Sequence, residues 1–189
     1  MTQLAAGESF EVSATRVRMG IGWDQDAGAG VARTGRPDVD LDATALQFTG
    51  SQLFDLAFYN NLKTRDGSVE HLGDNKTGSG EGDDEQVLVD LSKVHGPVDT
   101  ILFLVSSYQG HSLEWVANAY CRLVDDESDE ELARFTLTQS VTDTGAVLAL
   151  LRRSPHSSAT SGWALNAVGE GVPITVPTQG LAKLNRFLS

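Results

Sequence analysis

Short runs in which apolar and polar residues alternate recur through most of the chain, and Gly, Asp, Asn and Pro separate them. Such runs, bounded by turn residues, are typical of strands in an antiparallel β-domain. The pattern predicts an all-β protein with minor α structure, built as a two-sheet β-sandwich. The expected strands are Ser9–Ala14, Arg16–Trp23, Val39–Phe48, Leu53–Tyr59, Gln86–Leu91, Thr100–Tyr108, Ala119–Val124, Leu132–Thr138 and Gly162–Val168.

Two of these runs also indicate where their strands lie. Val87, Val89 and Leu91 alternate with Leu88 and Asp90, which predicts a strand with one face in the core. The run Ile101 to Val105 is apolar at every position, which is typical of a strand buried on both faces. We therefore expect the strand that contains Ile101 to Val105 to be central in its sheet.

Two short helices are expected to flank the sheets. Thr142 and Asp143 provide a cap and an acidic first turn, and apolar residues then follow at helical spacing, which predicts a helix over 143–153. Apolar residues after Thr178 repeat this spacing and predict a C-terminal helix that docks on the sandwich. A length of 189 residues without a long linker indicates a single domain over 1–189.

Composition and charge narrow the possible partners. The formal net charge of −12 argues against nucleic acid and anionic membranes as partners, because both require clustered Lys and Arg. The sequence contains one cysteine, Cys121, and therefore no internal disulfide, which favours a reducing compartment. No signal peptide and no membrane-spanning run is recognisable, so we expect a cytoplasmic protein without direct membrane insertion.

The main anomaly is the stretch from Asp66 to Glu85, which carries seven acidic residues and five glycines. Its end, Gly82-Asp83-Asp84-Glu85, places three like charges in succession, where repulsion disfavours order unless a cation neutralises them. Calcium accepts six to eight oxygen ligands in irregular geometry, and glycines let backbone carbonyls turn inward. The stretch predicts a calcium site. The alternative is a solvated acidic hairpin loop or a disordered insert.

A second acidic group is Asp38, Asp40 and Asp42, whose side chains share one face of an expected strand. For Asp38 alone, an ordinary loop position is the simpler interpretation. Asp24 ends a strand expected to neighbour Val39–Phe48, and it is a further candidate ligand. Neither acidic group has the residue spacing of an EF-hand.

Catalytic alternatives have weaker support. The four histidines show no paired or HExxH spacing, and no Gly-x-Ser-x-Gly elbow occurs. Cys121 stands in an apolar run, which predicts a buried inert thiol. Paired carboxylates could still serve a hydrolase through a bound metal, so no enzymatic activity is assigned and a metal-dependent enzyme stays open as a minority interpretation.

The chain resembles the TerD family, the tellurium-resistance and stress-response proteins of bacteria. The resemblance rests on Gly20-Ile21-Gly22-Trp23-Asp24, Asp40-Leu41-Asp42-Ala43, Phe58-Tyr59-Asn60-Asn61-Leu62, Asp66-Gly67-Ser68-Val69-Glu70-His71, the run from Gly73 to Glu85, Asn118-Ala119-Tyr120, Glu131-Leu132-Ala133-Arg134-Phe135 and the run from Trp163 to Gly169. It covers nearly the whole chain and implies a TerD-like β-sandwich with about two calcium ions near one end. The implied ligands are Asp24, Asp40, Asp42, Asp74, Asp83, Asp84 and Glu85, with Asn60, Asn75 and backbone oxygens near Gly80 and Gly82 as lesser candidates.

The resemblance implies a stress-response role without fixing a chemical step. The expected function is a calcium-dependent binding or scaffold module in resistance to tellurite and other chemical stress, with other stress-resistance proteins at the inner face of the membrane as partners. The alternative is a metal-dependent enzyme or a small-ligand protein, including one that binds cyclic nucleotides. An open metal position and a general base would favour the alternative.

Overall fold

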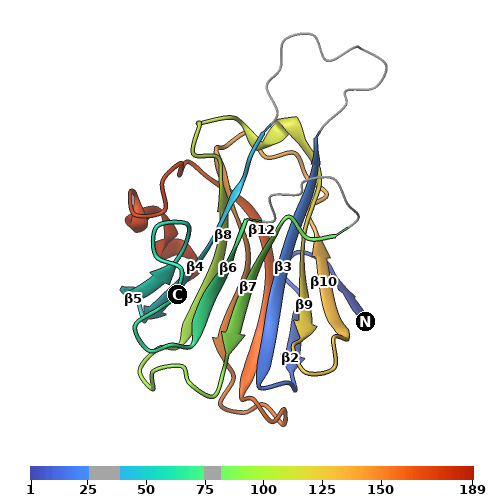
Figure 1. Ribbon diagram of the computed structural model, residues 1–189, viewed down its shortest axis with the longest axis vertical. Coiled ribbons are helices and arrows are strands. Elements are labelled where there is room, and N and C mark those ends of the chain that lie inside the picture. Colours follow the sequence, from blue (N-terminus) through green and yellow to red (C-terminus); the bar gives the residue numbers. More distant parts are fainter. Residues whose placement is uncertain (26–38, 75–81) are drawn as a thin grey trace.

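The computed structural model describes residues 1–25, 39–74 and 82–189, and within these ranges the side chains of Gln25 and Asp74 are not described. Two six-stranded sheets pack face to face as a β-sandwich (Figure 1). The first sheet has the order β1 (Thr2–Leu4), β10 (Glu131–Thr136), β9 (Val116–Asp125), β3 (Arg16–Gln25), β7 (Glu85–Asp90) and β6 (Val69–Asp74). The second has the order β2 (Ser9–Val12), β12 (Trp163–Val172), β11 (Gly145–Arg153), β8 (Thr100–Ser106), β4 (Asp42–Thr49) and β5 (Gln52–Ala57).

Strand pairing is antiparallel except for β1, which runs parallel to β10. Consecutive strands cross between the sheets at both sides of the sandwich, from β1 to β2 and from β5 to β6. The strands β3 and β4 lie in different sheets, so the expectation that Asp24 ends a strand beside Val39–Phe48 is wrong for strand pairing. The two-sheet sandwich itself is confirmed.

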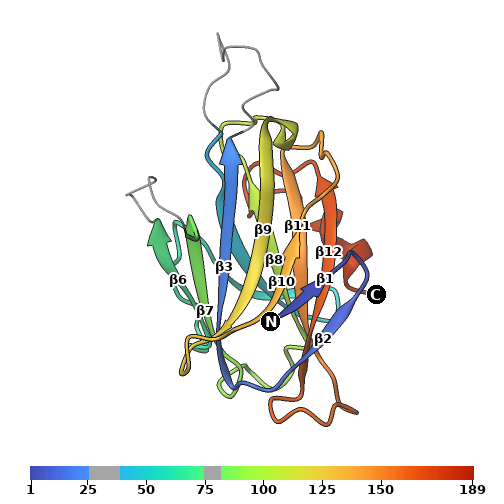
Figure 2. The same ribbon diagram turned by 90° about the vertical axis from the view of Figure 1, so that its right-hand side faces the viewer.

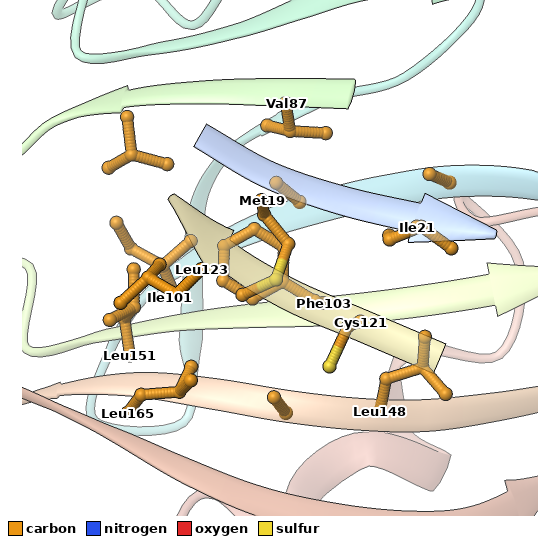
Figure 3. Close-up of a cluster of buried hydrophobic side chains, with 14 of the residues drawn as sticks. Met19, Ile21, Val87, Ile101, Phe103, Cys121, Leu123, Leu148, Leu151 and Leu165 are labelled. Carbon is orange, nitrogen blue, oxygen red and sulfur yellow. The ribbon is translucent and has the colours of Figure 1, made fainter. Parts of the chain in front are cut away.

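The main core fills the space between the sheets (Figure 3). Met19, Ile21 and Leu123 meet Phe103 and Leu148 there, and all five side chains are buried. Burial of apolar surface on this scale is the main favourable term in the folding of such a domain.

The inward face of β7 and the central position of β8 are as the sequence predicts. All seven residues of β8 are buried, because a second apolar cluster covers its other face. Cys121 lies in the main core, fully enclosed, and burial raises the pKa of its thiol to about 12.

The helix predicted over 143–153 is wrong, because this segment forms β11 in the middle of the second sheet. A bulge between Val147 and Ala149 interrupts the alternation of side chains. Leu148 and Ala149 therefore both join the main core, while Val147 and Leu150 join the second cluster. This irregular distribution imitates the spacing of an amphipathic helix.

The second apolar cluster lies between the outer face of the second sheet and a C-terminal 3-10 helix, η2 (Leu181–Phe187). Leu184 and Phe187 are the buried residues of η2. Figure 2 shows η2 on the side of the sandwich away from β3 and β9. The predicted C-terminal helix is therefore present as a short 3-10 helix. A second one, η1 (Leu113–Trp115), precedes β9. No helix in the described part of the chain is long and apolar enough to cross a membrane.

Candidate metal centre

Most of the predicted ligands lie where strands begin or end at one end of the sandwich. Asp24 is next to the last residue of β3, Asp42 begins β4, and Glu85 begins β7 (Figures 1 and 2). Asp74 ends β6, but its side chain lies outside the described part of the structure. Asn75 and Gly80 also lie outside it, whereas Gly82 is described and exposed. The predicted strands did not include β6, whose residues belong to the acidic stretch.

The carboxylate of Asp83 is occupied by a network of donors on the outer face of the first sheet. Its Oδ1 accepts hydrogen bonds from Nε of Arg122 at 2.8 Å and from the Tyr120 hydroxyl at 3.0 Å. Its Oδ2 accepts from Nη2 of Arg122 at 2.9 Å and from Nε2 of Gln86 at 3.0 Å. A carboxylate offers about four lone-pair positions, and four donors use them here. This arrangement favours Asp83 as an anchor for the start of β7.

The opposing charge of Arg122 controls the ionisation of this group. Burial raises the pKa of Asp83, but the hydrogen bonds from Arg122 and Gln86 outweigh it, so the net pKa is lowered. Glu131 accepts a further bond from Arg122 at 3.2 Å and bonds from Arg134, which extends the network across β9 and β10. Asp83 is therefore a fully ionised and fully compensated acid at neutral pH.

Two glycines of β3 make room for this network. A Cβ at Gly20 would lie 2.1 Å from Oδ2 of Asp83, and a Cβ at Gly22 would lie 2.6 Å from the Tyr120 ring. Both distances are far below van der Waals contact. The Gly-Ile-Gly sequence thus admits a carboxylate and an aromatic ring over the strand, while Ile21 points into the core.

Asp84 turns away from this network toward Asp24. Its Oδ2 accepts the backbone N–H of Trp23 at 2.8 Å, and Oδ2 of Asp24 accepts from the Asn118 side chain at 2.8 Å. Burial raises the pKa of Asp84; the Trp23 hydrogen bond lowers it, and the charges of Asp24 and Asp83 raise it further, so the net pKa is raised. Within the described ranges no ion pair joins Asp24 or Asp84 to a basic side chain, so these two neighbouring carboxylates create a local demand for a cation.

Glu85 points into the sandwich and joins the two sheets. It is only 4% exposed, and its Oε2 accepts the backbone N–H of Ala43 on β4. The same oxygen lies 3.1 Å from Nε2 of the buried His71 on β6. These contacts give Glu85 a structural role, because they link the last residue of the acidic stretch to β4 and β6.

Asp40, Asp42 and Asn60 lie together in a separate pocket. Tyr59, Tyr108 and Gln109 complete the residues that line it, and its volume is about 410 Å³. The structure therefore separates an Asp24–Asp84 pair from an Asp40–Asp42 pocket, while Asp83 and Glu85 have other partners.

The Asp24–Asp84 pair fits a hard divalent cation in the chemistry of its donors, since both side chains offer carboxylate oxygens. Among the described residues, no group of three or more His, Cys, Asp or Glu side chains has an arrangement that could hold a metal ion. A complete calcium shell needs six to eight oxygens, so the predicted ligands Asp74, Asn75 and Gly80 or water would have to supply the rest.

Several residues with a role in this region escaped the sequence reasoning. Arg122 and Gln86 bind Asp83, His71 contacts Glu85, and Tyr108 lines the pocket. Tyr120 appears in a recognised motif, but its contact with Asp83 joins residues 37 positions apart. Only the small residues of the Gly-Ile-Gly motif hinted that another part of the chain approaches β3 closely.

Comparisons with known proteins agree with this architecture. The family model described as "TerD domain" matches residues 1–185. The tellurium resistance protein TerD of Alcaligenes sp. is 39% identical over 182 residues, covering 89% of each chain. The stress response protein SCP2 of Bacillus subtilis is 35% identical over 170 residues, covering 83% of each chain.

The fold is shared with a solved structure of lower identity. The crystal structure of a homologue of telluride resistance protein (TerD) from Streptomyces coelicolor superposes with a TM-score of 0.67 at 18% identity, covering 89% of this chain and 95% of that one. Because a model of the family spans nearly the whole chain and relatives exceed 30% identity over most of it, the chain belongs to the TerD family, whose matched members include tellurium-resistance and stress-response proteins.

Proposed function

We propose that this protein is a calcium-binding member of the TerD family that acts as a calcium-dependent binding or scaffold module in resistance to tellurite and other chemical stress. The observation that carries the proposal is the approach of Asp84 to Asp24, with the pKa of Asp84 raised by burial and by neighbouring negative charge. An ion at this position would relieve the repulsion, and all the donor atoms on offer are oxygens. The relatives named for tellurium resistance and stress response support the biological setting.

Calcium suits this position better than magnesium does. Magnesium requires near-ideal octahedral geometry, whereas calcium tolerates the irregular shell that two carboxylates and oxygens from the glycine-rich part of the sequence would provide. The second predicted ion, at Asp40 and Asp42, would lie in the pocket that Tyr59, Asn60, Tyr108 and Gln109 also line. The same acidic lining would repel a phosphate, which weighs against a cyclic nucleotide as its ligand.

Calorimetric titration tests the proposal directly. We expect the purified chain to bind calcium more tightly than magnesium, Asp84→Asn to lose most of the calcium affinity, and Glu127→Gln to retain it. Glu127 is an exposed acid in the β9–β10 turn, so it matches the loss of charge without touching the site. Equal losses in both variants would show that net charge, and not a site, governs binding.

Thermal unfolding provides an independent measurement. A ligand that binds only the folded state adds RT ln(1 + [L]/Kd), so calcium at 100 times its Kd contributes about 2.7 kcal/mol per site. For a domain of this size, this corresponds to a rise in melting temperature of about 5–10 °C. An unchanged melting temperature between excess chelator and millimolar calcium at neutral pH would refute calcium binding by the folded chain.

A further inference from the structure

The end of β3 and the start of β9 meet at an irregularity beside the candidate cation site (Figure 2). The register of the two strands shifts between Gly22 and Asp24. Trp23, which lies between them, faces two residues of β9, Asn118 and Ala119. Two residues opposite one form a β-bulge, and such bulges turn side chains away from the regular alternation of a strand.

Asn118 has a backbone conformation that few residues adopt. Its φ is 52°, in the left-handed region, where Asn and Asp are enriched among the residues other than glycine. In the described part of the chain, the other non-glycine residue with positive φ is Asp129, in the turn after β9 at the opposite end of this strand. Glycine would adopt this conformation without strain. The backbone conformation alone therefore does not account for an amide side chain at position 118.

The amide of Asn118 holds the carboxylate of Asp24. Its Nδ2 donates a hydrogen bond to Oδ2 of Asp24 at 2.8 Å. An ionised carboxylate only accepts hydrogen bonds, so the amide atom that faces it is the nitrogen. The bond occupies one oxygen of Asp24, and Oδ1 can still contact a cation.

Asp24 needs such a restraint because it lies close enough to Asp84 for the two charges to repel each other. Asp84 is fixed through Oδ2, which accepts the backbone N–H of Trp23 at 2.8 Å. Asp24 is exposed, so its side chain could relieve the repulsion by rotating toward solvent when no ion is bound. The hydrogen bond from Asn118 opposes this rotation.

We propose that Asn118 is a positioning residue whose amide holds Asp24 beside Asp84 before a cation binds. The inference rests on the proposed calcium site and concerns how that site is formed. A side chain that is already in place loses less conformational freedom on binding, so the affinity is higher. Hydrogen-bonded partners of ligating side chains have this orienting effect at metal sites in general.

Calorimetric titration with calcium chloride separates the effect of the amide from that of the backbone. Asn118→Gly keeps the positive φ and removes the amide. It should weaken calcium binding about 3- to 10-fold, at or below the lower end of the effect of such partners, because this hydrogen bond is exposed. Asn118→Ala also strains the backbone, so it should bind calcium no more tightly than Asn118→Gly. Full affinity in Asn118→Gly would overturn the proposal, even if Asn118→Ala were weaker.

Asp129→Gly is the matched control. It replaces the other left-handed residue by glycine and also removes a negative charge, but it lies at the far end of β9. Its calcium affinity should stay within about twofold of the parent chain, because exposed charges at this distance are largely screened. A loss as large as that of Asn118→Gly would overturn the proposal, since neither change would then act through Asp24.

A measurement without the ion tests the positioning itself. Three-bond NMR couplings across χ1 of Asp24, recorded in excess chelator, should report one rotamer in the parent chain and in Asp129→Gly, and averaging between rotamers in Asn118→Gly. This measurement distinguishes two failures. A parent chain that binds no calcium would overturn the proposed function. Averaged couplings in the parent chain, or unchanged couplings in Asn118→Gly, would overturn the role of Asn118.

Discussion

Asp83 and Asp84 are neighbours in the sequence, but they belong to opposite electrostatic environments. Asp83 faces Arg122, Tyr120 and Gln86 and has a lowered pKa, whereas Asp84 faces Asp24 and has a raised one. The two residues directly precede β7, and their carboxylates meet different partners there. Three acids in a row are therefore not one cluster, and only one of Asp83, Asp84 and Glu85 is paired chiefly with like charge.

The largest expected effect comes from removing the compensated acid. Asp83→Ala should lower the free energy of unfolding by about 3 kcal/mol, because one partner of a buried ion pair is lost while Arg122 retains Glu131. The melting temperature should fall by about 6–12 °C for a domain of this size. Thermal unfolding in excess chelator measures this effect without a contribution from calcium. A loss no greater than that of Glu127→Ala would contradict the anchoring role.

A double-mutant cycle tests whether residue 20 must be glycine because the Asp83 side chain occupies the space of a Cβ. Gly20→Ala should destabilise the protein by about 2 kcal/mol through overpacking, because its Cβ would overlap the Asp83 carboxylate. In the Asp83→Ala background the same change should cost less than about 0.5 kcal/mol, and the difference measures the coupling. Gly96→Ala is the matched control, since its Cβ would meet no atom within 4 Å. Equal costs of Gly20→Ala in both backgrounds would exclude the contact as the cause.

The smallest expected effect is an increase in stability, and it comes from replacing Asp84. The pKa of Asp84 is raised in the folded state, so the folded chain binds this proton more readily than the unfolded chain does. The ionised side chain then costs stability at neutral pH, and the cost disappears as the pH falls below the carboxylate range. Asp84→Asn should therefore stabilise the calcium-free protein at pH 7 by less than about 1 kcal/mol, because the group is only partly buried.

Melting curves of Asp84→Asn and the parent chain between pH 7 and pH 4 check this sign. The difference should shrink as the pH falls. For Asp83 the lowered pKa reverses the dependence: its stabilising contribution is present above the pKa of the unfolded chain and is lost on acidification. If Asp84→Asn destabilised the calcium-free protein at pH 7, the contrast between the two neighbours would not hold.

The sequence was sufficient for the sandwich, most strands and the acidic stretch, because these depend on local alternation and turn residues. It misled at β11, where a bulge sends Leu148 and Ala149 to the same side and reproduces a helical spacing. It also missed β6, because its residues were assigned to the acidic loop. In both places the conformation depends on pairing with neighbouring strands. Those strands are distant in the sequence, so a local pattern of residues does not reveal them.

The candidate site shows the same limit more sharply. The sequence identified Asp83, Asp84 and Glu85 as chemically unusual. It could not show that each of the three side chains has different partners. Arg122 lies 39 residues from Asp83, and only the folded sheet brings them together. A count of acidic residues therefore overestimates the carboxylates available to an ion unless the basic residues on adjacent strands are also placed.

The enclosure of Cys121 has a consequence for the chemistry of a stressed cell. Oxidation to sulfenic acid begins from an exposed thiolate, and this thiol is both fully enclosed and held protonated by a pKa of about 12. The chain contains no other cysteine. The folded protein therefore offers peroxides and thiol-reactive oxyanions no sulfhydryl group to attack, and it cannot be cross-linked into disulfide dimers while its core stays closed.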